Sequence, residues 1–431
     1  MSDQRGSGGR AASRRSFMQG IGAAGAGLFG GTGVAQAAPA LPPGVSNAYY
    51  VYRTEDGYAG GGRYEVLDAR ENETVFTTSG GQNAHEAFQA AFDRVEDGGT
   101  VVASGDTFRF SGPATMGADT ALVGQHGTRF VVTPQGRRDS PFPGPNQTNP
   151  LVVGHDLIRV RGDNTAVTGI TFDANGAELG CHAIQADEVT GLTIANNRTV
   201  DGFEMAISFS GCQYVLARNN VVLDPNWYGI TSRAATDGLD LKRSTDVTII
   251  GNRVAGMKFN NIAPYNVSNF TVMGNVVYDG GHSLIACSPA QQGAIVGNVC
   301  RNLNRFGGDP GGEAGLEIEY KETHLTDAVA GTPEATSYDI TIANNHVENC
   351  QVGFIARTVP ADPDRTSSRE EDRPYNFTVT GNAFNDCPTA IRLRSGDSAV
   401  VGTNAIRNAE TAIDLDDTYT QNVEQGLNAT R

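Results

Sequence analysis

Lysine is almost absent from this chain of 431 residues, which contains lysine only at positions 242, 258 and 321. Lysine and arginine together number 32 against 48 aspartates and glutamates, which gives a formal net charge of −16. Recognition of nucleic acid needs basic patches that neutralise phosphates, so this balance argues against nucleic acid as a partner. A lysine-poor acidic surface favours a high-salt environment, and an ordinary acidic protein is the alternative interpretation.

Tryptophan and paired cysteines are scarce as well. Trp227 is the only tryptophan, and none of the six cysteines lies in a C-x-x-C pair, which argues against a zinc site. The 54 glycines favour many turns and argue against a helical bundle or a coiled coil. The length is ample for one large buried core or two ordinary domains, and hydrophobic residues make up 39% of the chain, so it can fold.

The N-terminal stretch carries the pattern of an export signal. S-R-R-S-F-M at Ser13 to Met18 precedes a weakly apolar stretch rich in glycine and alanine, which ends in A-Q-A at Ala35 to Ala37. This arrangement is typical of a twin-arginine signal peptide. The many glycines would make a poor spanning helix, so we expect no stable membrane insertion. We therefore expect a signal peptide at residues 1–37 and one mature, secreted or cell-surface domain at residues 38–431.

A short strand-like pattern that ends in asparagine recurs along the chain. Examples are L-T-I-A-N-N, V-T-I-I-G-N and F-T-V-T-G-N, and the commonest spacing between successive asparagines is 22 or 23 residues. This spacing, with occasional insertions, is typical of a solenoid. An inward amide at each turn can bond the backbone of its own coil and of the next. The recurring asparagines are Asn197, Asn220, Asn252, Asn275, Asn298, Asn345, Asn382 and Asn404.

Each period carries a second strand-like segment, in which the third and fifth residues are mostly apolar. These segments begin at positions 182, 205, 237, 260, 282, 314, 352, 389 and 411. Two short strands per period with no helix between them predict an all-β fold, a single-stranded right-handed parallel β-helix. An amphipathic helix at Ala84 to Val95 is expected to cap its N-terminal end, with Phe88, Ala91, Phe92 and Val95 on one face.

Two cysteines occupy equivalent positions in successive periods. Cys350 and Cys387 each fall five residues after a recurring asparagine, which predicts that they lie about 5 Å apart in neighbouring coils. An exported protein can form a disulfide there, and two stacked buried thiols are the alternative.

The outward positions of the second segment define the candidate functional face. If the third and fifth residues point inward, the fourth and sixth point outward, and rows of such side chains can bind a long polymer. In the segment that begins at 282, this numbering places Ile285 and Cys287 outward. The candidate catalytic residues on or beside the face are Asp237, Asp240, Lys242, Tyr265, His282, Lys321 and Arg357, and the candidate metal ligands are Glu317 and Glu319.

These coils resemble the pectin-lyase-like β-helix superfamily, and within it the polygalacturonase branch of glycoside hydrolases. That branch carries N-T-D-G-I-D, G-D-D-C-I-A, G-H-G-L-S-I-G-S and R-I-K on successive strands. The corresponding stretches in this chain are A-T-D-G-L-D at Ala235 to Asp240, K-F-N-N-I-A at Lys258 to Ala263, G-H-S-L-I-A-C-S at Gly281 to Ser288, and E-I-E-Y-K at Glu317 to Lys321.

The resemblance implies roles for two residues, and it shows that two catalytic aspartates of that family are replaced in this chain. Asp237 would match a water-activating aspartate, and His282 would match the active-site histidine of that family. Phe259 and Asn260 stand where the family places its aspartate pair, which includes the general acid. An inverting hydrolase needs both an acid and a base, and Asp237 alone cannot fill both roles.

The remaining groups favour chemistry that begins with removal of a proton. β-Elimination from a uronate needs a cation or metal to neutralise the carboxylate, a base, and a donor for the leaving oxygen. Glu317, Glu319, Lys321 and Arg357 loosely resemble the calcium site of metal-assisted β-helix lyases, so Ca²⁺ is the candidate cofactor. An ion pair between Arg357 and Glu319 is the structural alternative.

The sequence therefore predicts a secreted carbohydrate-active enzyme, a monomer, that acts on an acidic polysaccharide as a lyase or an epimerase. A glycoside hydrolase of polygalacturonase type that uses Asp237 and Asp240 is the second hypothesis. A non-catalytic protein that binds polysaccharide at the cell surface is the third. Pure binding would be expected to use sugar-stacking tryptophans, and Trp227 is the only one in the chain, although tyrosines can substitute.

Overall fold

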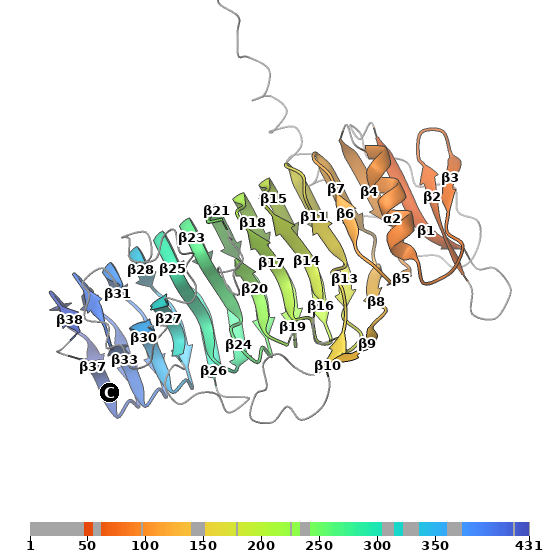
Figure 1. Cartoon of the computed structure of the whole chain (residues 1–431). Coiled ribbons are helices and arrows are strands. Elements are labelled where there is room, and N and C mark those ends of the chain that lie inside the picture. The colour runs from red at the N-terminus through yellow and green to blue at the C-terminus, as the bar shows by residue number, and fades with distance from the viewer. Residues whose placement is uncertain are drawn as a thin grey trace, which may run out of the picture.

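The computed structural model describes residues 47–54, 62–95, 98–138, 151–177, 180–224, 226–232, 242–303, 314–321, 336–359, 373–416 and 419–430. These residues form one elongated solenoid of stacked coils (Figure 1). The expected signal peptide, residues 1–37, and the expected start of the mature domain at residue 38 lie outside them. No helix of the described part is long and apolar enough to cross a membrane.

Three faces of parallel strands build the solenoid. We call the face that carries the candidate site face 1. Each of its strands pairs with the strands of the neighbouring coils, and the first and last strands have one such neighbour each. Its strands are β6 (Ala114–Met116), β11 (Ile158–Val160), β14 (His182–Asp187), β17 (Met205–Ser210), β20 (Tyr228–Ser232), β23 (Ile262–Met273), β25 (Ser283–Val296), β27 (Ala314–Lys321), β30 (Val352–Val359), β33 (Thr389–Leu393) and β37 (Thr411–Leu415).

Face 2 follows face 1 along the chain. The long strands β23 and β25 run from face 1 into face 2 without interruption, and they join the two faces into one 26-stranded sheet. The other strands of face 2 are β1 (Ala48–Thr54), β4 (Gly99–Ala103), β7 (Thr120–Gly124), β12 (Thr165–Thr168), β15 (Thr190–Ala195), β18 (Gln213–Arg218), β21 (Ser244–Ile250), β28 (Tyr338–Ala343), β31 (Tyr375–Thr380), β34 (Gly396–Asp397), β35 (Val400–Gly402), β38 (Thr420–Gln421) and β39 (Glu424–Gln425).

Face 3 is a separate 12-stranded sheet of short strands. It contains β5 (Thr107–Phe110), β8 (Arg129–Val132), β13 (Thr171–Asp173), β16 (Arg198–Val200), β19 (Val221–Leu223), β22 (Arg253–Ala255), β24 (Val276–Gly280), β26 (Val299–Leu303), β29 (His346–Glu348), β32 (Ala383–Asn385), β36 (Ala405–Arg407) and β40 (Ala429–Thr430). The prediction of two strands per period was therefore incomplete. Most strands of face 3 are three residues long, which is too short for an alternating pattern to be recognised.

The recurring asparagines form a buried hydrogen-bonded ladder, as predicted. Asn275 is typical: its Nδ2 donates to the carbonyl oxygen of Ile249 at 3.0 Å and to Oδ1 of Asn298 at 2.9 Å. Its own Oδ1 accepts from the backbone N–H of Asn252 at 2.9 Å. All eight predicted asparagines take part, and the ladder continues to Asn428, which the sequence analysis missed. The turns of the solenoid are thereby satisfied internally.

The predicted capping helix is present as α2 (Ala84–Phe92), followed by a 3₁₀ turn at Asp93–Val95. It lies at the N-terminal end of the solenoid (Figure 1). All four residues predicted for one face are buried, and the ring of Phe88 lies 4.7 Å from that of Phe130, centroid to centroid. Beside it, β1 pairs in antiparallel fashion with β2 (Arg63–Asp68), which pairs with β3 (Glu73–Thr77). A further hairpin joins β9 (Gln135–Arg138) and β10 (Leu151–Val153).

Two of the second segments were assigned to the wrong residues. In the coil after β17, the strand of face 1 is β20, which pairs with both β17 and β23, so the segment that begins at 237 is not that strand. In β25, Ile285 pairs with the buried Ile262 of β23. Ile285 and Cys287 therefore point into the core, and not outward as predicted. Both errors have one cause. After an insertion or a shift of one residue, the apolar residues still alternate as they would in a strand, so the local pattern does not show which register is correct.

The six cysteines are buried free thiols, including Cys350 and Cys387. Each of these two donates from Sγ to a nearby backbone oxygen, of Glu348 and Asn385 respectively. Burial raises the pKa of both thiols, which keeps them protonated and unreactive.

We therefore expect all six thiols to react with a thiol reagent after the purified protein is unfolded without reductant. The protein should be unfolded under conditions that prevent reoxidation, and a sample reduced beforehand serves as the control. Two fewer thiols in the unreduced sample would instead support the disulfide between Cys350 and Cys387.

Candidate functional site

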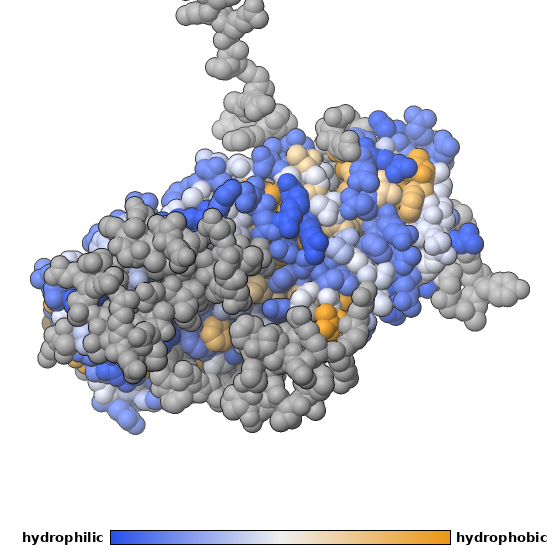
Figure 2. Space-filling model, viewed as in Figure 1, coloured by the Kyte–Doolittle hydropathy of each residue, from blue (hydrophilic) through white to orange (hydrophobic). Residues whose placement is uncertain are grey.

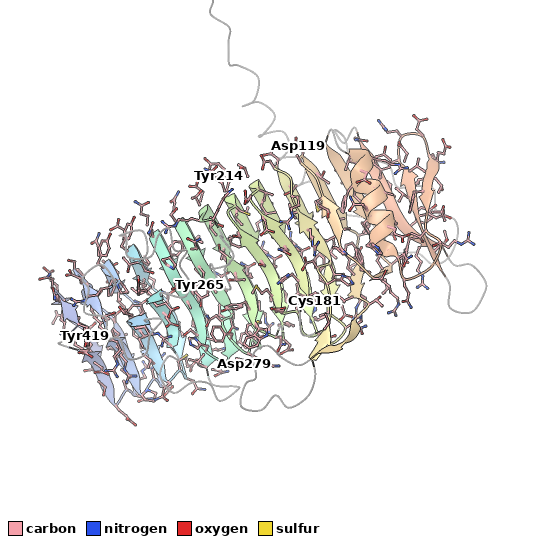
Figure 3. All side chains as sticks on the ribbon, in the orientation of Figure 1. Asp119, Cys181, Tyr214, Tyr265, Asp279 and Tyr419 are labelled. Atoms are coloured by element: carbon pink, nitrogen blue, oxygen red, sulfur yellow. The ribbon has the colours of Figure 1, made fainter. Side chains whose placement is uncertain are left out.

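The site lies on the outward side of face 1, midway along the solenoid, where Figure 3 labels Tyr265. The strand register places equivalent side chains of successive coils beside one another. One outward row contains Ala263, Ala286, Glu317, Ile355 and Arg392, and Glu319 pairs with Arg357 in the neighbouring row. Ala263 and Tyr265 belong to a small apolar cluster that is separate from the main core. In this view the described surface is largely hydrophilic (Figure 2).

A buried ion pair joins β27 to β30. Arg357 donates from Nε to Oε1 of Glu317 at 2.5 Å, and its Nη2 lies 3.5 Å from Oε2 of Glu319. Ser283 donates its hydroxyl to Oε2 of Glu317 at 2.6 Å. The Glu317 side chain is 0% exposed and that of Arg357 is 14% exposed. The predicted ion pair between Arg357 and Glu319 is present, and Arg357 makes its shorter contact with Glu317.

The neighbours of Glu317 keep its carboxyl ionised. Burial alone would raise the pKa of this group, but the Arg357 guanidinium, His282 and the Ser283 hydroxyl together lower the pKa below its ordinary value of 4.5. The guanidinium in turn has a raised pKa, because attraction to Glu317 outweighs burial. A carboxylate of this kind can orient a cation or accept a hydrogen bond, but it cannot act as a general acid near neutral pH.

The lowered pKa predicts how this ion pair contributes to stability at different pH. A group whose pKa is lower in the folded protein stabilises the fold above its ordinary pKa, and that contribution is lost as the pH falls through the folded-state value. We therefore expect the stability difference between the wild type and Glu317→Gln to shrink on acidification below the ordinary value of 4.5. Urea unfolding between about pH 7 and about pH 3 measures it. A difference that stays constant with pH would contradict the lowered pKa.

Aromatic rings line the N-terminal side of the ion pair. The rings of Tyr228 and Tyr265 lie 6.0 Å apart and those of Tyr228 and Phe259 lie 5.3 Å apart, in edge-to-face arrangements. His282 stacks on Phe259 at 4.5 Å. Burial raises the pKa of both tyrosine hydroxyls, so each remains a proton donor and not a base. Rings of this kind provide apolar faces on which a sugar can stack.

Asn260 fixes the orientation of His282. The Oδ1 of Asn260 accepts from the backbone N–H of Ser283 at 2.9 Å, and its Nδ2 donates to the hydroxyl of Tyr265. The Nδ1 of His282 lies 3.2 Å from the same Oδ1. Because a backbone N–H can only donate, that atom of Asn260 must be the oxygen, and Nδ1 of His282 therefore carries a proton. The nitrogen of His282 that gains or loses a proton is Nε2.

The structure brings five of the nine predicted site residues together. They are Tyr265, His282, Glu317, Glu319 and Arg357. Lys242 does not join them, because its exposed amine pairs with Glu188 at 2.5 Å. Lys321 ends β27, and its side chain lies outside the described part. Asp237 and Asp240 also lie outside it, between β20 and β21. The prediction that Asp237 begins a strand of face 1 was wrong, because β20 is the strand of face 1 in that coil.

The described residues do not fit the expected calcium site. Both oxygens of the Glu317 carboxylate are engaged, one by Arg357 and one by Ser283. Within the described ranges, no group of three or more histidine, cysteine, aspartate or glutamate side chains is placed to hold a metal ion. A calcium ion at Glu317 would have to displace a guanidinium from a buried carboxylate, which is costly. We therefore expect that activity at this cluster does not require calcium.

Sequence reasoning missed four participants of the site. Tyr228 was missed because the strand of its coil was assigned to other residues. Ser283 was missed because the register of its coil was shifted by one. Phe259 and Asn260 were noticed only as departures from the polygalacturonase pattern, although they hold His282 in place.

The fold is a right-handed parallel β-helix, as predicted. No family model matches the chain, and no curated protein matches its sequence. Among solved structures, the chain is similar to DFA-IIIase from Arthrobacter chlorophenolicus A6 in complex with DFA-III, with 14% identity and a TM-score of 0.53 over 79% of this chain and 83% of that one. It is also similar to a hyperthermoactive exopolygalacturonase from Thermotoga maritima, with 11% identity and a TM-score of 0.51 over 79% and 87%.

Proposed function

We propose that this protein is a secreted carbohydrate-active enzyme, a glycoside hydrolase that cleaves an acidic polysaccharide on face 1. The observation that carries the proposal is a cluster on the outward side of one β-helix face. It joins His282, Glu317, Glu319 and Arg357 to the rings of Tyr228, Phe259 and Tyr265. Charged groups beside aromatic rings are the ordinary composition of a sugar-binding site. An exopolygalacturonase and a DFA-IIIase bound to DFA-III have similar folds.

In this proposal the described cluster binds the sugar, and the acid and base come from another segment. Glu317 is held ionised by Arg357, so it cannot protonate the leaving oxygen. Asp237 and Asp240 are the carboxyl groups that we assign to this chemistry. They follow β20, whose Tyr228 contacts Tyr265 in the cluster. One would protonate the leaving oxygen, and the other would activate the water.

Elimination or epimerisation is the second candidate, and a specific observation favours it. The cluster contains three groups: a histidine whose Nε2 can take up or release a proton, a tyrosine hydroxyl, and a guanidinium. These are a base, a proton donor and a cation, the groups that abstraction of the C5 proton from a uronate requires. Lys321 is the alternative base. In this candidate Asp237 and Asp240 would have no role in the chemistry.

A single incubation separates the two reactions. The mature protein, in high salt, would be incubated with a panel of acidic polysaccharides while new reducing ends and absorbance near about 235 nm are followed, since elimination leaves an unsaturated uronate and hydrolysis does not. We expect reducing ends without absorbance. Absorbance would support the lyase, and the absence of both signals would leave the epimerase or a binding protein. A parallel incubation with chelator tests the calcium requirement, and we expect full activity.

Two substitutions then test the assignments. We expect Asp237→Asn to lower turnover on the order of 100-fold or more and Lys321→Ala to leave it nearly unchanged, because only a hydrolase needs the carboxyl groups. Rates at saturating substrate measure this, with circular dichroism of both variants as the control for folding. The opposite order of effects would transfer the proposal to elimination with Lys321 as the base.

A further inference from the structure

Arg373 is an unusually buried arginine. It immediately precedes β31 and is 4% exposed, and it is the only lysine or arginine among the buried polar residues that the structure describes. Its Nε and Nη1 are buried, and within the described part of the chain neither has a hydrogen-bond partner. Other arginines of the described solenoid behave differently, since Arg129, Arg159 and Arg357 each contact a carboxylate within 3.0 Å.

A second orphaned polar group lies in the neighbouring coil. Tyr338 pairs with Tyr375 between β28 and β31, so Thr336 occupies the position that corresponds to Arg373. Thr336 is 0% exposed, and its hydroxyl also has no partner in the described residues. Neighbouring strands lie about 4.8 Å apart, so the two positions are close enough to contact one ligand.

These two positions are linked to the candidate site. Ser337, next to Thr336, donates its hydroxyl to the backbone oxygen of Glu319 at 2.8 Å. Arg373 follows β30 in the chain, and β30 carries Arg357. Thr336 therefore lies close to Glu319, and Arg373 occupies the corresponding position in the next coil, which carries Arg357.

A buried guanidinium with two nitrogens that lack partners is costly for the folded protein. Burial of a charge without a partner is expensive, and a buried arginine is normally retained with a carboxylate or another anion. A guanidinium can also donate as a planar fork to the two oxygens of one carboxylate, through Nη2 together with either Nη1 or Nε. The orphaned Thr336 hydroxyl can donate a further hydrogen bond to the same anion.

We propose that Arg373 and Thr336 form a binding site for the carboxylate of a sugar acid. The inference rests on the proposed function, because it assigns to these residues the acidic group of the polysaccharide that is cleaved on face 1. Arg373 binds the carboxylate through its fork, and Thr336 donates to one of the same oxygens. The site lies beside the cluster, so it selects acidic over neutral sugar chains.

Thermal unfolding with and without ligand tests the site directly. Sodium galacturonate and sodium glucuronate are the probes, with glucose and with sodium chloride of equal ionic strength as controls. We expect a uronate to raise the Tm of the wild type, while glucose and sodium chloride leave it unchanged. We expect Arg373→Met to raise the Tm without ligand, because it removes a buried charge with two nitrogens that lack partners, and to abolish the response to uronate.

Two variants and one competing anion complete the test. Arg373→Lys keeps the charge without the fork and should bind uronate about 30-fold more weakly or worse by calorimetry. Arg407→Met, which removes an exposed arginine, should respond as the wild type does. A lower Tm of Arg373→Met without ligand, together with a retained uronate response, would show that Arg373 is structural. A wild type stabilised by sulfate and not by uronate would overturn the carboxylate assignment.

The test of the carboxylate site can fail or succeed independently of the test of the proposed hydrolase activity. Uronate binding that depends on Arg373 would support the site even if no polysaccharide is cleaved. Cleavage of acidic and neutral polymers at equal rates, unchanged in Arg373→Met, would leave the hydrolase in place and overturn the site.

Discussion

Glu317→Gln should destabilise the protein by about 3–5 kcal/mol and lower turnover on the order of 100-fold. The carboxylate is 0% exposed and lies 2.5 Å from the Arg357 guanidinium, so its loss leaves a buried cation without its nearest counter-charge. The second effect follows because Glu317 also accepts from Ser283, next to His282, so the whole cluster depends on this carboxylate for its geometry. Urea unfolding and saturating-substrate rates measure the two effects.

A paired substitution separates charge from geometry. Glu317→Leu combined with Arg357→Met removes both charges, and replacement of a buried ion pair by apolar groups is often neutral for stability. We expect this double variant to recover most of the lost stability and none of the lost activity. Glu348→Gln serves as the control, because Glu348 is 43% exposed in its pair with His346 and should change stability little. Full activity in the double variant would remove the ion pair from the proposed site.

Asn275→Leu should destabilise the protein by about 3 kcal/mol or more. Asn275 is 0% exposed, and leucine would leave the backbone N–H of Asn252 and the carbonyl oxygen of Ile249 without their partners. A buried donor or acceptor that loses its partner costs about 1–3 kcal/mol, and two are lost here along with the contacts to the neighbouring amides. The midpoint of urea unfolding measures the loss.

Asn385→Leu is the matched control for the ladder. Asn385 lies in β32 on face 3, is partly exposed and is not a rung of the ladder. The same change of side chain at this position should alter stability by less than about 0.5 kcal/mol. Equal effects at Asn275 and Asn385 would mean that the rungs contribute no more than ordinary surface amides.

The solenoid was predictable because its repeats satisfy one local requirement again and again. Each coil needs an amide at the same turn, so the asparagines from Asn197 to Asn404 recur in the sequence and mark the coils. The register within a coil was less predictable. Position 237 was mistaken for the start of a strand because D-G-L-D-L has the alternation of a strand, whereas pairing with both neighbours selects β20.

The site was predictable in its membership and not in its contacts. Alternation along β27 and β30 is enough to place Glu317, Glu319 and Arg357 on one surface. Sequence alone gives no sign that Glu317 is fully buried or that Arg357 prefers it to Glu319, since both depend on side-chain conformations across three coils. Arg373 carries no sequence signal at all, because it lies in no strand and repeats no pattern.

The asparagine ladder also has an evolutionary consequence. Asn298 bonds to Asn345 with the same geometry as Asn275 to Asn298, although 47 residues separate the first pair and 23 the second. The stacking of coils is therefore indifferent to the length and composition of what is inserted between rungs. A solenoid of this kind can gain, lose or exchange insertions beside the same face. A lineage can therefore change its substrate specificity without having to evolve a new fold.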